Sequence, residues 1–441
     1  MDTGTAQASQ SIAPEGTNSR ILIVAEHASA KFGGEAILPL HYFRFLREAG
    51  FEAWLLVHAR TRNELSTVLG SDVSRVFYIE DSFLNIACHR LSRFVPARIA
   101  DFTLGAISQL HNQLRLRKVA KQLVTILGVT IVHQPIPVSP KLPSFMHGLG
   151  APVVIGPMNG GMDYPPGYRK SGSIEEVAIA ILRSTANLMN RMIPGKSKAA
   201  CLLVANDRTR AALPDSVKSA PVSTLVENGV DLRLFEGADS RATPETTEAN
   251  IIYVGRLVDF KRVDLLIDAC LSLRGREDVK LHIVGDGPLR AQLEARATLL
   301  GDKVVFHGRL PQADVATQMA RSTALVLPSM RECGGAVVLE AMASGCPVIA
   351  AAWGGPLDYL TDECGTLVAP STPQQFVVEL AGAISRLVRS PELAKKHATA
   401  ARKRVELHFD WRHKTRQILV IYATILKQDE QAGSKTMPDR V

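Results

Sequence analysis

The sequence of 441 residues is long enough for two or three domains, and its 46% of apolar residues could fill two cores. No apolar run reaches the ~18 to 20 residues of a membrane span, and the six cysteines show neither zinc-site nor disulfide spacing. The net charge of +8 favours an anionic partner, but no RNA- or DNA-binding motif occurs, so nucleic acid is not expected.

The amino-terminal part begins with a polar stretch, residues 1–19, which lacks the apolar core of a signal peptide and is expected to be a disordered tail. Residues 21–25 form a β-branched run, residues 35–48 carry apolar side chains on one helical face, and residues 53–57 follow as a second strand. This order predicts the start of a parallel α/β sheet. Further strands are predicted at 129–132, 152–155 and 202–204.

Polar and glycine-rich segments follow these strands, at the sheet edge where ligands bind in open α/β folds. Gly33 and Gly34 lie in the first strand-to-helix loop, where they could bring backbone N–H groups close to a phosphate or sugar. A tight turn without a ligand would explain them equally. His133 ends a strand and could hydrogen-bond a sugar hydroxyl. The segment 156–161, Gly-Pro-Met-Asn-Gly-Gly, is expected to line the same cleft.

Residues 82–200 are strongly basic, with 14 Lys and Arg residues against 4 Asp and Glu, a net +10. Within them, residues 83–123 mix Leu, Ile and Phe with Arg and Lys, a composition typical of helices that lie on an anionic membrane surface. A core helix with a solvated basic face explains the same residues, so both interpretations stay open.

A second α/β series begins near residue 250, after a turn-rich segment at 227–231. Its strands alternate with helix-length segments, the pattern of a doubly wound sheet. The chain is therefore predicted to be α/β, with two Rossmann-like parallel-sheet domains facing across a cleft. The five strands are predicted at 251–254, 280–284, 304–306, 324–327 and 347–350.

Two carboxylates, Glu332 and Glu340, bracket a glycine pair that opens a helix. Gly334 and Gly335 would leave the first N–H groups of that helix free for a diphosphate. Glu332 could accept hydrogen bonds from sugar hydroxyls, and Glu340, one turn into the helix, could bind a ribose diol. A helix-dipole role for Glu340 and a solvated loop position for Glu332 are the alternative.

Two cations follow the first strand of the second series. Arg256 and Lys261 could bind a diphosphate and stabilise the charge that develops as it leaves, although a solvated basic loop is the alternative. No D-x-D motif occurs, so no metal site is predicted and this pair would replace the metal. Because neither half carries G-x-G-x-x-G with a following acidic residue, a nicotinamide oxidoreductase is poorly supported.

These residues together resemble glycosyltransferase family 4, a large group of retaining GT-B enzymes. The resemblance is close from residue 228 to about 368 and looser before, through Gly33-Gly34, His133 and residues 156–161. It rests on Asn-Gly-Val-Asp, Val-Gly-Arg-Leu, Val-Gly-Asp-Gly-Pro-Leu and the Glu-x(7)-Glu context of Glu332 and Glu340.

The resemblance implies a role for each matching residue. Arg256 and Lys261 would bind the donor diphosphate, Glu332 and His133 the transferred sugar, and Glu340 the ribose. Further donor contacts would come from Gly34 beside the phosphates, from backbone near Leu310 for the base, and from N–H groups of Cys333, Gly334 and Gly335. Departures from the family occur at Cys333 and Gly335, and its usual Glu near Gly354-Gly355 is represented at best by Asp358.

The domain organisation follows from the same resemblance. It implies an acceptor domain at 20–225, a donor domain at 226–410 and a final helix at 411–427 that crosses back onto the first domain. Residues 428–441 resemble residues 1–19 in composition and are expected to be a flexible tail. The donor would be a UDP- or GDP-sugar, with no cofactor and no metal. Front-face displacement would retain the anomeric configuration, and the leaving phosphate would take the acceptor proton.

The function expected is a hexosyltransferase acting on a saccharide or lipid-linked acceptor, in polysaccharide or lipopolysaccharide synthesis. Its expected place is the cytoplasm or the inner face of the membrane. A GT-B sugar-nucleotide epimerase and a non-catalytic sugar-nucleotide binding protein are the alternatives. The basic stretch argues against the first, and the joint presence of Arg256, Lys261, Glu332 and Glu340 argues against the second.

Overall fold

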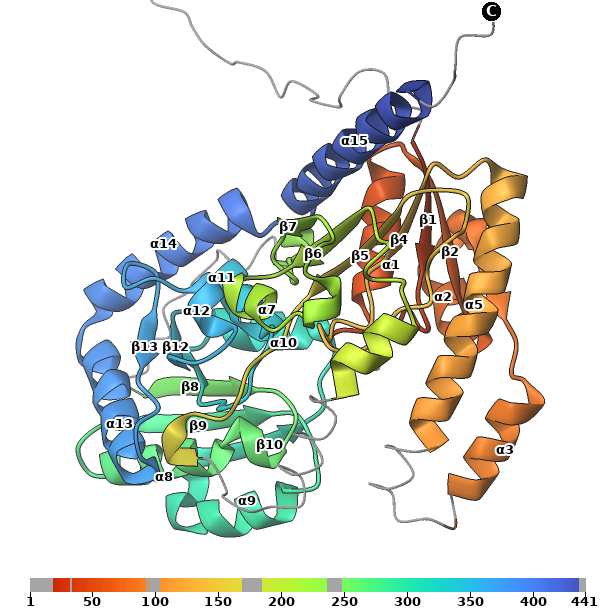
Figure 1. Cartoon of the computed structure of the whole chain (residues 1–441). Coiled ribbons are helices and arrows are strands. Elements are labelled where there is room, and N and C mark those ends of the chain that lie inside the picture. The colour runs from red at the N-terminus through yellow and green to blue at the C-terminus, as the bar shows by residue number, and fades with distance from the viewer. Residues whose placement is uncertain are drawn as a thin grey trace, which may run out of the picture.

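The chain folds into two α/β domains, each built on one parallel sheet (Figure 1). The structure is a computed structural model that describes residues 19–31, 34–92, 94, 104–168, 185–235 and 248–435. The tail predicted at 1–19 lies outside these residues except for Ser19. The predicted α/β architecture with two parallel-sheet domains is confirmed.

The amino-terminal sheet has seven parallel strands in the order β3-β2-β1-β4-β5-β6-β7. Their bounds are β1 Arg20–Val24, β2 Glu52–His58, β3 Val76–Ile79, β4 Ile131–Gln134, β5 Val153–Met158, β6 Cys201–Val204 and β7 Val222–Thr224. The five predicted strands correspond to the central ones. The sequence analysis missed β3 and β7, which are the two edge strands.

Helices cover both faces of this sheet. They are α1 Leu38–Glu48, α2 Arg62–Val68, α3 Phe83–Ser92, α5 Ala106–Leu127, α7 Asp207–Ala211 and α15 Trp411–Lys435. One face is closed by α1 and α15, whose apolar residues join those of β1 and β2 in one core. The other is covered by α5, which buries Leu116, Ala120 and Leu123. Gly128, at φ +60°, ends α5 in the left-handed conformation that glycine adopts without strain.

The carboxyl-terminal sheet has six parallel strands in the order β10-β9-β8-β11-β12-β13. The strands are β8 Ala249–Val254, β9 Val279–Val284, β10 Val304–Gly308, β11 Ala324–Leu327, β12 Val348–Ala351 and β13 Thr366–Val368. The helices are α8 Val263–Leu273, α9 Arg290–Ala297, α10 Gln312–Ala320, α11 Ala336–Ala343, α12 Pro356–Tyr359, α13 Pro373–Arg389 and α14 Pro391–His408. The five predicted strands are present, and β13, an edge strand, was missed.

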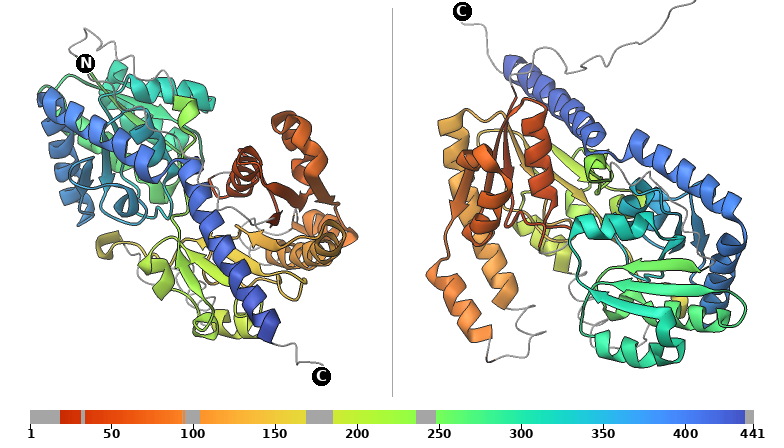
Figure 2. Two further views of the ribbon diagram at one scale, coloured as in Figure 1. Left: turned by 90° about the horizontal axis from the view of Figure 1, so that it is seen from above. Right: turned by 180° about the vertical axis from the view of Figure 1, so that it is seen from behind.

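The chain crosses between the domains twice, and the two crossing segments are hydrogen-bonded to each other. Val230 N donates to Phe409 O at 2.8 Å, and Trp411 N donates to Val230 O at 3.1 Å. Beyond this point α15 packs on the amino-terminal domain, as expected (Figure 2). It buries Ile418 and Tyr422 there. The helix continues to Lys435, so the prediction of a flexible tail from residue 428 is wrong for residues 428–435. Among the described residues, no helix is long and apolar enough to cross a bilayer.

Candidate functional site

The loops that follow the carboxyl ends of β8 and β11 bring Lys261 and Glu332 together. Met330 N donates to Phe260 O at 2.9 Å, which ties the two loops side by side. Lys261 Nζ then donates to Glu332 Oε2 in a largely buried ion pair. Two residues 71 positions apart therefore meet at the edge of the sheet where the sequence analysis placed the diphosphate and the sugar.

The 332–335 loop presents the start of α11 to the same edge. Gly335 precedes the helix at φ +71°, a conformation that a residue with a Cβ adopts only with strain. Gly335, the N-cap residue, has no side chain that could cap this helix end. The first N–H groups of α11 are consequently available to an anion, and the helix dipole favours negative charge there.

Glu340 lies on the second turn of α11 and is partly exposed. Burial among its neighbours raises the pKa of Glu340 to about 7. Among the described residues its carboxylate has no hydrogen-bonding or ionic partner, as expected of a group that binds a ligand. Arg256, also without an ion-pair partner in the described part of the chain, is exposed directly after β8. Leu310 follows β10 at the same edge and packs on the domain core.

His133 lies near the end of β4 and is buried. Its side chain has no exposed surface, because α15 covers the end of β4. Its Nε2 lies 2.6 Å from Gly156 O and its Nδ1 lies 2.7 Å from Tyr422 Oη. Burial lowers the pKa of His133 to about 4, so the ring is neutral. With both nitrogens engaged, His133 links α15 to the sheet in this structure, and its contact with the transferred sugar stays a prediction.

The glycine pair of the first loop is only half described. Gly33 lies outside the described residues. Gly34 is exposed and has open space around it. The next residue, Glu35, is also exposed, although desolvation by the surrounding protein raises its pKa. After burial, the negative charge of Glu35 is among the smaller causes that raise the pKa values of Glu227 and Cys333, so this loop and the 332–335 loop are near enough for their charges to act on each other.

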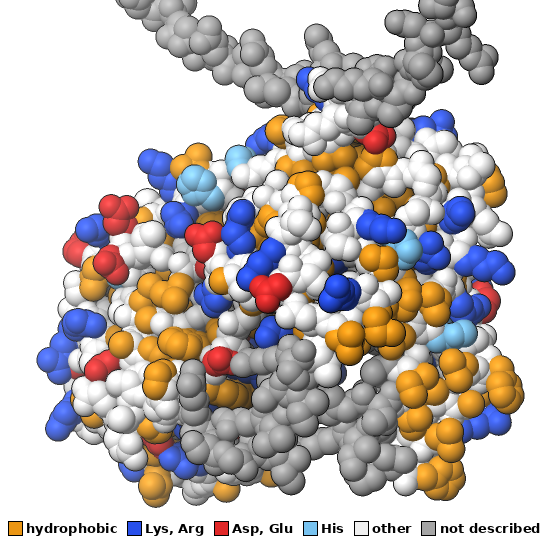
Figure 3. Space-filling view, in the orientation of Figure 1, with side chains coloured by type: hydrophobic (Ala, Val, Ile, Leu, Met, Phe, Trp, Pro, Cys, Tyr) orange, Lys and Arg blue, Asp and Glu red, His pale blue; other side chains and the backbone are white. Residues whose placement is uncertain are grey.

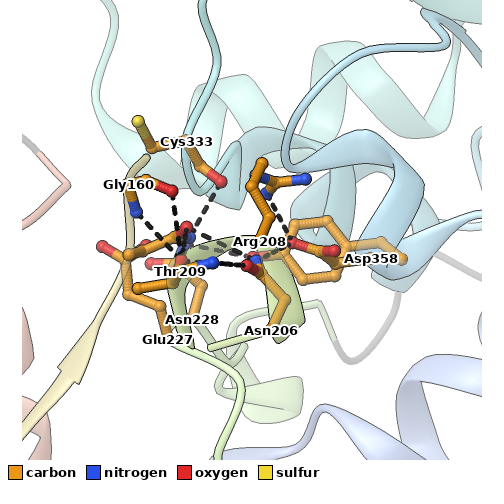
Figure 4. A network of polar contacts seen from close by, with 10 residues as sticks. Gly160, Asn206, Arg208, Thr209, Glu227, Asn228, Cys333 and Asp358 are labelled. Atoms are coloured by element: carbon orange, nitrogen blue, oxygen red, sulfur yellow. Dashed lines mark hydrogen bonds and ion pairs between the residues drawn. The ribbon is translucent and has the colours of Figure 1, made fainter. Parts of the chain in front are cut away.

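A polar network joins the two domains at these loops (Figure 4). Asn159, from the predicted cleft segment 156–161, donates from Nδ2 to Glu227 Oε2 at 2.7 Å and to Cys333 O at 2.8 Å. Burial raises the pKa of Glu227 to about 7. Lys414 of α15 donates to Glu227 O, and burial lowers the pKa of Lys414 to about 7. The sequence analysis did not single out Asn159 or Glu227, because their partners are distant in sequence.

A second connection lies beside the first. Asn206 Nδ2 donates to Asp358 Oδ2 at 2.8 Å, and Arg208 forms an ion pair with the same oxygen at 3.3 Å. Asp358 is therefore committed to holding the domains together. Among the described residues, no group of three or more His, Cys, Asp or Glu side chains could hold a metal ion.

The space around Gly334 leads to a first prediction. A Cβ at this position would lie 2.3 Å from Asn228 Nδ2 and 2.8 Å from Glu227 Oε2. We expect Gly334→Ala to lower the free energy of unfolding by about 1–3 kcal/mol, as overpacking does. Gly382→Ala is the matched control, since Gly382 is exposed in α13 with open space around it, and alanine should stabilise that helix. Denaturant unfolding checks both, and equal midpoints for Gly334→Ala and the wild type would contradict the prediction.

Part of the chain matches a known family. Residues 237–404 match the family described as glycosyl transferases group 1. Glycogen synthase from Mycobacterium tuberculosis is 30% identical over 227 residues, which are 49% of this chain and 53% of that protein. D-inositol 3-phosphate glycosyltransferase from Frankia alni is 32% identical over 217 residues, 45% and 52% of the two chains. The chain thus spans about half the length of these curated relatives.

Solved structures resemble almost the whole chain. Sucrose-phosphate synthase from Thermosynechococcus elongatus superposes with a TM-score of 0.63 at 21% identity, over 93% of this chain and 100% of that one. The Anabaena protein HepE in complex with UDP and glucose gives a TM-score of 0.62 at 18% identity, over 92% and 100%. At these identities the likeness establishes the fold, which is the GT-B fold.

Proposed function

We propose that this chain, whose residues 237–404 belong to the glycosyl transferases group 1 family and whose fold is GT-B, is a retaining hexosyltransferase. It would move a hexose from a UDP- or GDP-sugar to a saccharide or lipid-linked acceptor, in the synthesis of cell-surface polysaccharide or lipopolysaccharide. The observation that carries the proposal is the Lys261–Glu332 pair beside the uncapped start of α11. The complex of HepE with UDP supports a nucleotide donor.

The donor would bind along the edge of the carboxyl-terminal sheet. Arg256, Lys261 and the first N–H groups of α11 provide positive charge for the diphosphate. Glu340 would accept hydrogen bonds from both ribose hydroxyls, and the backbone near Leu310 would contact the base. Glu332 is already partly neutralised by Lys261, so it can accept hydrogen bonds from the sugar without bringing an unbalanced charge to the diphosphate.

The transfer step follows from this placement. The acceptor oxygen forms a bond to the anomeric carbon while the bond from that carbon to the phosphate oxygen breaks. The acceptor proton passes to the departing phosphate on the same face of the sugar, which retains the configuration. Arg256, Lys261 and the helix dipole stabilise the charge on the leaving group. We propose that this departure needs no bound metal ion.

A nucleotide screen tests the proposal. We expect UDP or GDP, but not both equally, to raise the unfolding temperature of the purified chain by several degrees, because a ligand that binds only the folded state stabilises it. Lys261→Ala should lose most of this shift. No shift with UDP, GDP, ADP or their sugar conjugates would overturn the donor assignment.

The acceptor proposal is supported by a surface on the amino-terminal domain. Figure 3 shows hydrophobic side chains gathered over α3 and the adjoining end of α5. Phe83 and Phe94 are each 87% exposed, and Leu91 is 54% exposed. The exposed cations Arg90, Lys118 and Lys121 lie on the same two helices. A surface that combines exposed phenyl rings with lysine and arginine suits insertion into an anionic bilayer surface. We propose that this surface holds the protein on the inner face of the membrane, beside lipid-linked acceptors.

The double variant Phe83→Glu/Phe94→Glu tests this surface. Each buried phenyl side chain contributes about 1.5–3 kcal/mol, so we expect binding to anionic vesicles to fall at least ~10-fold. The matched control is Leu299→Glu/Val378→Glu, which alters two similarly exposed apolar residues of the other domain. Sedimentation with vesicles measures both. Equal loss in the two double variants, or none in the first, would contradict membrane docking through α3.

A further inference from the structure

The side chain of Asn159 makes hydrogen bonds to three separate parts of the chain. It is 3% exposed and follows β5 in the amino-terminal domain. Its Nδ2 donates to Glu227 Oε2 at 2.7 Å and to Cys333 O at 2.8 Å. Its Oδ1 accepts from Thr209 Oγ1 at 3.4 Å and from Asn206 Nδ2 at 3.5 Å. Figure 4 shows these groups converging from both domains.

The Cys333 carbonyl has tight packing on its other side. Gly355 N donates to Glu332 O at 2.6 Å, and a Cβ at Gly355 would lie 2.6 Å from Cys333 O. The start of α12 thus supports the 332–335 loop from within its own domain. Asn159 supports the same loop from the other domain, so the two contacts together fix the direction of the Cys333 peptide.

Glu227 belongs to the pivot of the two domains. It lies three residues before Val230, which pairs with Phe409 and Trp411 at the second crossing, and Lys414 holds its backbone oxygen. A rotation of one domain about this pivot would lengthen the bond from Asn159 to Cys333. The bond therefore depends on how the two domains are arranged.

We propose that Asn159 is a positioning residue for sugar transfer. Through its side-chain amide it aligns the 332–335 loop, which carries Glu332, in the arrangement of domains seen here. This inference rests on the proposed transferase function. The donor's diphosphate and ribose would contact Arg256, Lys261, Glu340 and the first N–H groups of α11, which the helix itself holds in place; the Asn159 side chain hydrogen-bonds to none of these groups. The bond from Asn159 to Cys333 consequently governs how the sugar is held during transfer and has little influence on donor binding.

Kinetics of Asn159→Ala test the inference. We expect kcat to fall about 10- to 100-fold, as for small displacements of a reacting group, while the donor KM and the nucleoside diphosphate Kd change less than about 3-fold. Asn190→Ala is the matched control. Asn190 is equally buried in the same domain but donates to Lys141 O and Ala186 O at 2.8 and 2.9 Å. The Asn190→Ala variant should be less stable than the wild type, while its kcat stays within about 3-fold of the wild-type value. Unchanged kcat in Asn159→Ala would overturn the proposal.

The double variant Asn159→Asp/Glu227→Gln separates alignment from stability. The amide introduced at position 227 can donate to the carboxylate introduced at position 159, which restores the bond between these two positions. The new carboxylate, however, cannot donate to the Cys333 carbonyl, because an ionised carboxylate only accepts. We expect an unfolding midpoint above that of Asn159→Ala, because the bond to position 227 is restored, and a kcat still at least ~10-fold low. Recovery of kcat to the wild-type value would show that the Cys333 contact is irrelevant.

Hydrogen–deuterium exchange distinguishes failure of this inference from failure of the proposed function. In Asn159→Asp/Glu227→Gln, amides at 332–336 should exchange faster than in the wild type, while those of α5 and α13 stay unchanged. This readout needs neither donor nor acceptor. If the wild type bound no nucleotide, the transferase proposal would fail by itself. Unchanged exchange at 332–336 would overturn the positioning role.

Discussion

Alanine at Lys261 or at Glu332 should lower turnover at least ~100-fold, the loss seen when a charged contact to the transition state is removed. Lys261 would stabilise the charge on the departing diphosphate, and Glu332 would hold the sugar that is being transferred. Because the two side chains form one largely buried pair, each removal also leaves its partner without its counter-charge. The double variant should therefore cost less than the product of the two single losses.

Lys303→Ala is the matched control for this prediction. Lys303 also forms ion pairs, with Glu248 and Asp278 at 2.7 Å each, but it directly precedes β10 at the opposite edge of the same sheet. Turnover of Lys303→Ala should stay within about 2-fold of the wild type, because Lys303 lies at the opposite edge of the sheet. The stability of this variant should also change little, since exposed ion pairs contribute little to stability. Full activity of Lys261→Ala or Glu332→Ala would contradict the assignment of the site.

Glu340→Gln should weaken nucleotide binding about 10- to 100-fold, the effect of losing hydrogen bonds to a charged group. The wild type should also bind nucleotide more tightly as the pH rises. The pKa of Glu340 is about 7, so roughly a tenth of the groups are ionised at pH 6 and about nine-tenths at pH 8. The ionised form can accept one hydrogen bond at each oxygen, and these charge-assisted bonds are stronger than those to the protonated form. Glu340→Gln should lack this pH dependence.

The same pKa predicts an opposite effect on stability. Burial raises the pKa of Glu340 above its value in the unfolded chain, so its contribution to stability is full at low pH and is lost as the pH rises through about 7. Without nucleotide, Glu340→Gln should therefore unfold at a higher temperature than the wild type at pH 8. The pH dependence of nucleotide affinity is measured by titration calorimetry with a nucleoside diphosphate and with its 2′-deoxy analogue. Equal pH dependence for both nucleotides would contradict a ribose contact.

Most of the fold follows from local patterns in the sequence. Central strands are buried on both faces, so runs such as residues 324–327 are continuously apolar and easy to recognise. The strands β3, β7 and β13 were missed because they are short edge strands, half open to solvent, where the apolar signal is weak. The carboxyl part of α15 was missed because it is polar, and polar composition alone does not exclude a helix.

The donor side of the site could be predicted because its residues follow consecutive strands of one sheet, and parallel strands end at the same edge. The contact between Lys261 and Glu332 is a direct result. The junction between the domains could not be predicted from the sequence, because Asn159 and Cys333 are 174 residues apart and no spacing rule relates them. His133 has the right position along its strand, but its surroundings depend on α15, which crosses back from the far end of the sequence.

The most direct test of the account is the release of nucleoside diphosphate from UDP- and GDP-sugars, measured with EDTA for the wild type and for Glu332→Ala. The account predicts that the wild type releases the nucleotide from one donor class and that Glu332→Ala is at least ~100-fold slower. No release from any donor, release that stops in EDTA, or equal rates for the two proteins would contradict it.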